Sequence, residues 1–263
     1  MDYSYWLKQE RSKPLYPDIE WSKPERRNQA GKLGIIGGNK LGFSGVAEAY
    51  AVAAKTGVGE MRVLLPDVLK KTIPSSMTDA LFAPTNLSGS LSKDATPELR
   101  ALGAWAEGIL LIGDAGRSSE TAIVYEQFVQ EYEGLLTVTR DAVDLVKNSA
   151  TLLVDRPNTV LVLSFAQLQK LFQSVYYPKV LTFSMQLTNL VEALHKFTIT
   201  YPITVAVLHK DTFIIAHGGN VVTTPWKNAM LIWRGTVAAK AATYWLWQAS
   251  KPLESIATSL VGE

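Results

Sequence analysis

Short apolar runs rich in β-branched residues alternate along the chain with longer amphipathic or alanine-rich segments. The apolar runs predict strands at 33–37, 61–65, 108–113, 135–139, 151–154, 159–163, 204–208 and 212–216. The helical pattern predicts helices at 45–57, 66–72, 96–105, 119–133, 141–147, 165–173, 178–197, 228–249 and 252–260. Strands separated by helices favour parallel crossovers, so we expect an α/β fold whose mainly parallel sheet is covered on both faces.

The first 30 residues differ from the rest of the chain, and no internal repeat divides residues 31–263. We therefore expect an N-terminal arm, residues 1–30, and a single α/β domain over residues 31–263. The arm combines prolines with aromatic residues, and we expect it to wrap a groove of its own chain or a neighbouring subunit. Its members are Pro14, Pro17, Pro24, Tyr3, Tyr5, Trp6, Tyr16 and Trp21. With Tyr244, Trp245 and Trp247 in the last long helix, these aromatic residues predict a homo-oligomer.

Composition and charge remove several classes of function. The 263 residues carry a net charge of only +2 and contain no basic block, so we expect no nucleic-acid partner. The chain has no cysteine, which excludes disulfides and thiolate metal sites, and its three histidines form no metal-binding pattern, so no metal site is predicted. No apolar run could span a membrane and no signal peptide is evident, so we expect a cytoplasmic protein without a membrane partner.

The candidate chemistry begins at KLGIIGGNKLGFSG, residues 32–45, where a predicted strand ends in a glycine-rich loop before a helix. Glycines let the backbone approach a ligand, and a helix N-terminus favours an anion. The alternative is a strand-to-helix turn that only needs positive φ. The loops at 113–116 and 139–141 also come directly after predicted strands, so all three should share one crevice at the carboxyl ends of the strands.

Residues 31–66, GKLGIIGGNKLGFSGVAEAYAVAAKTGVGEMRVLLP, resemble the opening of the ADP/ATP-dependent NAD(P)H-hydrate dehydratases. Those enzymes phosphorylate the hydroxyl of hydrated NADH or NADPH and eliminate phosphate. The resemblance implies a ribokinase-like three-layer α/β/α sandwich with a mainly parallel central sheet. It also implies ADP or ATP as co-substrate, with Mg, and an NAD(P)H hydrate as substrate.

Further landmarks occur in the family's order, and by position they imply two sets of site residues. The positions that correspond to substrate-binding residues are Gly38, Asn39, Phe43, Gly45, Val46, Gly116, Asp141 and Ser164. Those that correspond to nucleotide-binding residues are His209, Lys210, Thr212, Arg234 and Gly235. Several differ in type from the family: Ser164 stands where the family has histidine, and Gln167 where it has glutamate.

The segment Ile232-Trp233-Arg234-Gly235-Thr236 stands where the family carries Gly-Gly-Ser-Gly-Asp at a helix N-terminus. In the family, the amides of this segment form an anion hole and the aspartate takes the proton of the attacking hydroxyl. Thr236 offers only a hydroxyl at that catalytic position, so we expect it to be a helix N-cap without a role as a base. Arg234 either holds a phosphate without transferring it or is a solvated or interface residue.

The resemblance leaves three functions open. The first is a catalytically weakened or inactive homologue of the dehydratases, which are lyases. The second is a non-catalytic nucleotide-binding or oligomeric structural protein of the same fold. The third is a small-molecule kinase of the carbohydrate type, which would also need the missing aspartate. The loss of the aspartate at Thr236 favours a non-catalytic protein.

Overall fold

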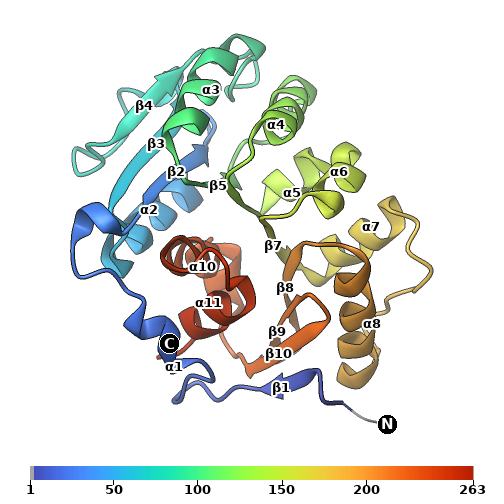
Figure 1. The fold of residues 1–263 in the computed structure, drawn as a ribbon. Coiled ribbons are helices and arrows are strands. Elements are labelled where there is room, and N and C mark those ends of the chain that lie inside the picture. Colours follow the sequence, from blue (N-terminus) through green and yellow to red (C-terminus); the bar gives the residue numbers. More distant parts are fainter. Residues whose placement is uncertain (1–2, 263) are drawn as a thin grey trace.

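A computed structural model describes residues 3–262, which form one ten-stranded sheet with helices on both faces (Figure 1). The strand order is β1-β10-β9-β8-β7-β6-β5-β2-β3-β4. The pairs from β4 through β3, β2, β5, β6 and β7 to β8 are all parallel. Strand β9 is antiparallel to both of its neighbours, β8 and β10, and β1 is parallel to β10. The strands are β1 (Trp6–Lys8), β2 (Lys32–Gly37), β3 (Glu60–Pro66), β4 (Ala80–Ala83), β5 (Gly108–Gly113), β6 (Leu135–Thr139), β7 (Thr159–Ser164), β8 (Thr204–His209), β9 (Thr212–His217) and β10 (Asn220–Pro225). The expected three-layer, mainly parallel fold is confirmed.

The helices divide between the two faces of the sheet. Helices α3 to α8 cover one face, whereas α2, α9, α10 and α11 cover the other, with α1 packed on α11. Their bounds are α1 (Pro17–Trp21), α2 (Ser44–Thr56), α3 (Thr96–Trp105), α4 (Ser119–Glu131), α5 (Asp141–Leu145), α6 (Ala150–Asp155), α7 (Phe165–Ser174), α8 (Leu187–Thr200), α9 (Ala229–Trp233), α10 (Thr236–Trp247) and α11 (Pro252–Ser259). Among residues 3–262, no helix has the length and apolarity needed to cross a bilayer.

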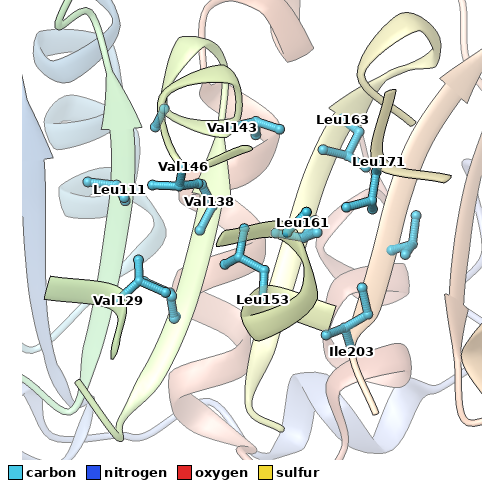
Figure 2. Close-up of a cluster of buried hydrophobic side chains, with 14 of the residues drawn as sticks. Leu111, Val129, Val138, Val143, Val146, Leu153, Leu161, Leu163, Leu171 and Ile203 are labelled. Atoms are coloured by element: carbon cyan, nitrogen blue, oxygen red, sulfur yellow. The ribbon is translucent and has the colours of Figure 1, made fainter. Parts of the chain in front are cut away.

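The apolar runs form strands because their residues point alternately into two cores. In β5, Leu111 belongs to the core under α3 to α8, whereas Leu110 and Ile112 belong to the core under α2 and α10. Figure 2 shows part of the first core, where Leu111, Val138, Leu161 and Leu163 of the sheet meet side chains of the covering helices. Since both faces are buried, these strands carry few polar residues.

Four predicted elements are wrong or misplaced. Residues 151–154 belong to helix α6 and not to a strand, because a short apolar run does not reveal its period. The helix predicted at 178–197 begins only at Leu187, after an irregular segment. The helix predicted at 228–249 is interrupted at Gly235, whose φ of 88° ends α9 before α10 begins. The segment predicted as a helix at 66–72 contains only a 3₁₀ turn at Asp67–Leu69.

Three short strands escaped the sequence pattern: β1, β4 and β10. The signal for β10 was present, because Gly218 and Gly219 both have positive φ and form the hairpin turn after β9. β1 and β4 are the two edge strands, and with three and four residues they are too short to show a strand periodicity.

The N-terminal arm lies against its own chain. β1 pairs with β10, and the buried side chain of Gln9 donates to the Ala257 carbonyl at 2.7 Å and to the Thr224 hydroxyl at 3.3 Å. In α10, Trp245 is buried, and the Lys23 ammonium of the arm lies over the Trp247 ring. Burial of Trp245 inside the chain means that it is not the subunit contact that the sequence suggested.

Candidate functional site

The carboxyl ends of the parallel strands carry a concentration of unusual backbone conformations. Positive φ is found in the loops after β2, β5, β6 and β8 and between α9 and α10. The glycines are Gly38 (95°), Gly113 (87°), Gly116 (69°) and Gly235 (88°), and the other residues are Asp114 (54°), Arg140 (56°) and Lys210 (52°). Non-glycine residues held at positive φ cost energy and cluster at functional sites, so this edge of the sheet is the candidate site.

Arg140 fills the space between the two glycine loops. A Cβ atom on Gly45 would lie 2.7 Å from the Arg140 Cζ, and one on Gly235 would lie 3.6 Å from the Arg140 Cδ. The glycine loop after β2 and the α9–α10 junction therefore face one crevice. The guanidinium donates to the Asp114 carboxylate through Nη2 and to the Trp233 carbonyl through Nη1.

Asp114 acts as an internal anion at the start of α2. Its Oδ2 accepts a hydrogen bond from the Gly45 amide at 2.5 Å, while Oδ1 is paired with Arg140. Anions are favoured at helix N-termini, and here a side chain of the chain itself takes that place. The Gly45 amide is therefore already satisfied.

Asp141 supports the loop after β5. Its carboxylate accepts hydrogen bonds from the Asp114 amide at 2.7 Å and the Ala115 amide at 3.0 Å. Burial raises the pKa of Asp141, an effect that these amide hydrogen bonds oppose. Both carboxylate oxygens of Asp141 accept from backbone amides, so this candidate substrate-binding residue holds the loop after β5 in place.

The remaining candidates in the β2–α2 region are held by structural contacts. Asn39 is buried and donates from Nδ2 to Ser90 Oγ at 2.6 Å, while its Oδ1 accepts from the Leu41 amide at 2.9 Å. Val46 is fully buried, and Phe43 packs against the same core. Gly116 lies nearby, where an added Cβ would be 3.5 Å from the Asn39 Nδ2.

Thr236 is the first residue of α10, and its N-cap is Gly235 in the left-handed conformation. The expected N-cap role of Thr236 is therefore wrong, because the glycine can adopt the backbone angles of this tight junction. The buried Thr236 hydroxyl donates instead to the Glu48 Oε1 of α2 at 3.2 Å. Sequence reasoning missed Glu48, although it is the lone acidic residue of the alanine-rich helix α2.

Gln167 ties Arg140 to α7. Its Nε2 donates to the Arg140 carbonyl at 2.7 Å and to the Asp144 Oδ2 at 2.8 Å. Its Oε1 accepts from the Ser164 backbone amide at 3.0 Å. The Ser164 hydroxyl in turn accepts from the backbone amide of Gln167, which completes a capping box for α7. Gln167 thus holds the backbone of Arg140 in its left-handed conformation, and Ser164 is occupied by helix capping.

A pocket of about 380 Å³, which we call the β7–β8 pocket, opens beside Arg140. It lies at the carboxyl ends of β7 and β8, under α9. Most of its wall is apolar, and the largest apolar side chains are Phe165, Phe183, Leu208, Ile232 and Trp233. Arg140, Ser164, Gln167, Gln169 and Lys210 are among its polar lining residues.

Only Lys210 of the five candidate nucleotide-binding residues lines this pocket. His209 is buried with its Nε2 3.2 Å from the Met185 carbonyl and its ring against Phe165, and burial lowers its pKa. Thr212 pairs with His209 at the hairpin turn. Arg234 is exposed, and Gly235 caps α10.

The residues of the crevice do not fit a magnesium ion. Mg²⁺ is held in proteins by carboxylates and waters, but Asp114 is paired with Arg140 and Asp141 accepts two backbone amides. Within residues 3–262, no three His, Asp or Glu side chains gather in a way that could hold a metal ion.

No family model matches the chain, and no curated protein matches it. Several solved structures are similar to it. A ribokinase-like superfamily protein from Enterococcus faecalis V583 is 13% identical, with a TM-score of 0.73, over 98% of this chain and 87% of that chain. The ADP/ATP-dependent NAD(P)H-hydrate dehydratase from Bacillus subtilis, co-crystallised with ATP/Mg²⁺, is 11% identical, with a TM-score of 0.60, over 94% of this chain and 85% of that chain. Phosphomethylpyrimidine kinase from Clostridium difficile 630 is 10% identical, with a TM-score of 0.52, over 87% and 96%.

These likenesses establish the fold. The chain has the ribokinase-like fold, and the structures that share it include a dehydratase and a kinase. A shared fold does not fix the chemistry, which depends on the residues at the crevice.

Proposed function

We propose that this protein is a non-catalytic relative of the NAD(P)H-hydrate dehydratases, which binds a ligand in the β7–β8 pocket beside the crevice without transferring a phosphoryl group. The observation that carries the proposal is the Arg140 guanidinium, which lies between Gly45 and Gly235 and pairs with Asp114. The guanidinium and its partner carboxylate fill the space between the two loops.

Phosphoryl transfer needs a positioned nucleophile and donors for the phosphate oxygens, together with a base that takes the proton. Here the position of the base is a threonine hydroxyl, and the segment that forms the anion hole in the family carries the bulky Ile232 and Trp233 in place of two glycines. Loss of general-base assistance costs about 10²–10⁴ in rate, and loss of an anion-hole donor costs about 10²–10³ more. The two losses together favour a protein without turnover.

A second candidate is a weakened dehydratase or a small-molecule kinase in which Glu48 replaces the missing base. The observation that favours it is the position of the Glu48 carboxylate, 3.2 Å from the hydroxyl of Thr236. ADP or ATP would be the co-substrate in either case. The fold neighbour crystallised with ATP/Mg²⁺ supports an adenine nucleotide as the ligand to test first.

Location and assembly belong to the same proposal. We propose a cytoplasmic protein that associates with itself. Self-association is supported by large apolar side chains that remain exposed near the crevice, among them Leu41, Leu87 and Trp233, whose exposed fractions are 88%, 102% and 55%.

The test is a turnover assay on the full chain with NADPH hydrate and either ADP or ATP in the presence of Mg²⁺, monitored by the recovery of NADPH absorbance. We expect a rate that equals that of the protein-free control. A thermal shift with ADP, ATP and NADPH measures binding separately, because a ligand of the native state raises its melting temperature.

Turnover above the control would contradict the proposal. Loss of that turnover in Glu48→Gln would then support the second candidate. The matched control is Glu60→Gln, at an exposed residue that begins β3 at the opposite edge of the sheet, and it should keep the wild-type rate.

A further inference from the structure

We infer that the β7–β8 pocket takes a flat, largely apolar ligand that carries one negative charge, and that it does not take a polyphosphate. The inference rests on the proposed function, in that it names the class of ligand that the non-catalytic protein would bind in this pocket. Three features of the pocket support the inference: its apolar walls, the small number of polar groups left without a partner, and its single unpaired positive charge.

The walls suit a flat apolar body. A volume of about 380 Å³ lies within the range of small-molecule sites, roughly 300–1,000 Å³. Phe183 and Trp233, which both line the pocket, have exposed fractions of 63% and 55%. Exposed aromatic rings at the mouth of a concave site gain stability when a ligand covers them, and they favour ring stacking over single-atom contacts.

Most of the polar side chains that line the pocket are already hydrogen-bonded to other groups of the protein. The Thr139 hydroxyl donates to the Val162 carbonyl at 3.1 Å, and the side-chain Nε2 of Gln169 donates to the Leu181 carbonyl at 2.8 Å. Ser164 and Gln167 satisfy each other in the capping box of α7. These groups position the walls and leave few hydrogen bonds for a ligand.

Lys210 differs from the other polar residues that line the pocket. It is exposed, and within residues 3–262 its ammonium makes no hydrogen bond or ion pair. Its φ of 52° turns the chain between β8 and β9 at the edge of the pocket. A cation beside an apolar wall is complementary to a ligand with an apolar body and one anionic group.

The charge of the pocket argues against a polyphosphate. The only other cation in its lining is Arg140, which Asp114 neutralises. A nucleoside triphosphate brings several negative charges, and phosphate sites usually meet them with backbone amides, Arg, Lys or metal ions. Here one free lysine stands alone, which matches a single carboxylate or sulfonate.

The test measures the binding of 2-naphthoate and of neutral 2-naphthamide to the full-length protein by titration calorimetry. We expect naphthoate to bind about tenfold more tightly, because a hydrogen bond to a charged group contributes that much affinity. In Lys210→Met the two affinities should become equal, and Lys210→Arg should restore the difference. Lys55→Met, at an exposed lysine of α2, should leave the difference in affinity between the two probes unchanged.

A second variant tests the location. Ala166 is exposed on the pocket wall, so Ala166→Phe should block the site and weaken naphthoate binding at least tenfold without disturbing the core. Ala101→Phe, at an exposed position of α3, is the matched control and should bind like the wild type. Circular dichroism of each variant reports whether the fold is kept.

Equal affinity of the wild type for the two probes would overturn the inference, as would the absence of naphthoate binding by a folded protein. Displacement of naphthoate by ATP, with an ATP affinity that depends on Lys210, would show that the pocket binds a polyphosphate. That result would also overturn the inference. The failure of the proposed function is separate, because turnover of NADPH hydrate would contradict that function without changing the probe titrations.

Discussion

Arg140 shows how one side chain can decide the chemistry of a crevice. It is held at positive φ, its carbonyl accepts from Gln167, and its guanidinium bridges Asp114 and the carbonyl of Trp233. These contacts join the loops after β5 and β6 to α9. The site is thus closed by an ion pair that also holds its loops together.

Removal of this side chain should destabilise the fold. Arg140→Ala leaves the Asp114 carboxylate largely buried without its cation, and breaking such a pair costs about 3 kcal/mol. Urea unfolding should show a loss of this size. Arg234→Ala, which removes an exposed arginine at the end of α9, should stay within about 0.5 kcal/mol of the wild type.

A double variant makes the reason testable. Asp114→Asn combined with Arg140→Ala removes the unpaired charge, so part of the lost free energy of unfolding should return. An Arg140→Ala protein as stable as the wild type would contradict the role given to the ion pair.

His209 should make the stability fall in mild acid. Its pKa is lowered from the ordinary 6.5, first by burial and also by the nearby charge of Lys210, so the folded state favours the neutral ring. The unfolded chain takes up the proton more readily. The stabilising contribution is therefore present above pH 6.5 and is lost as the pH falls through the lower, folded-state pKa.

We expect the free energy of unfolding to decrease as the pH falls through and below 6.5, and to decrease less in His209→Gln. His217, whose pKa is also lowered by burial, should retain its own share, and the double variant His209→Gln/His217→Gln should show the flattest profile. Urea unfolding at a series of pH values measures this. The same pH profile in the wild type and both variants would refute the assignment.

At the level of elements, the junction of α9 and α10 depends on Gly235. Its φ is 88°, and an added Cβ would lie 2.5 Å from the Ile112 Cδ1 in the core. Gly235→Ala should therefore cost about 2 kcal/mol through backbone strain and overpacking. Thermal or urea unfolding measures the loss.

Gly42 provides the matched control. A Cβ at Gly42 would meet no atom within 4 Å, and its φ lies outside the left-handed region, so Gly42→Ala should be neutral to within about 0.5 kcal/mol. Equal stabilities of the two glycine variants would contradict the steric argument.

The sequence predicted the elements that carry a strong local signal. The apolar runs of β2, β5, β6 and β7 correctly predicted parallel strands, and hence that the glycine loop at 37–45 shares one edge of the sheet with the loops after β5 and β6. The contacts that decide its chemistry could not be predicted, because they join distant positions. The Thr236–Glu48 hydrogen bond spans 188 residues, and the bond from Arg140 to the Trp233 carbonyl spans 93.

The Arg140–Asp114 pair was missed for a second reason. Both residues have positive φ in loops. An arginine gives no sequence signal for that conformation, and an aspartate, which tolerates it, is also common in ordinary turns. A local pattern indicates that a loop comes after a strand, but not which side chain will turn inward.

For the molecule as a whole, the N-terminal arm should contribute to the stability of the fold. Deletion of residues 1–9 would remove β1 and the buried hydrogen bonds of Gln9, and would leave β10 as an unprotected edge. We expect a lower melting temperature and, by light scattering, an unchanged number of subunits, because these contacts lie within one chain.

Gln9→Ala in the full-length chain is the companion variant, and it should reproduce part of the loss of melting temperature, since it leaves the edge strand in place. Dissociation of an oligomer on truncation, with no change in thermal stability, would instead assign the arm to a subunit interface.

The pairing of β1 with β10 has a consequence for how the protein is made. The Gln9–Thr224 contact closes a separation of 215 residues, so within the described sheet β1, which precedes the other strands in the sequence, pairs with β10, which follows them. During translation, residues near Trp6 must remain unpaired while β2 to β9 assemble, and their docking completes the sheet only after β10 has been synthesised. A nascent chain stalled before β10 should therefore show protease-sensitive N-terminal residues beside an already protected central sheet.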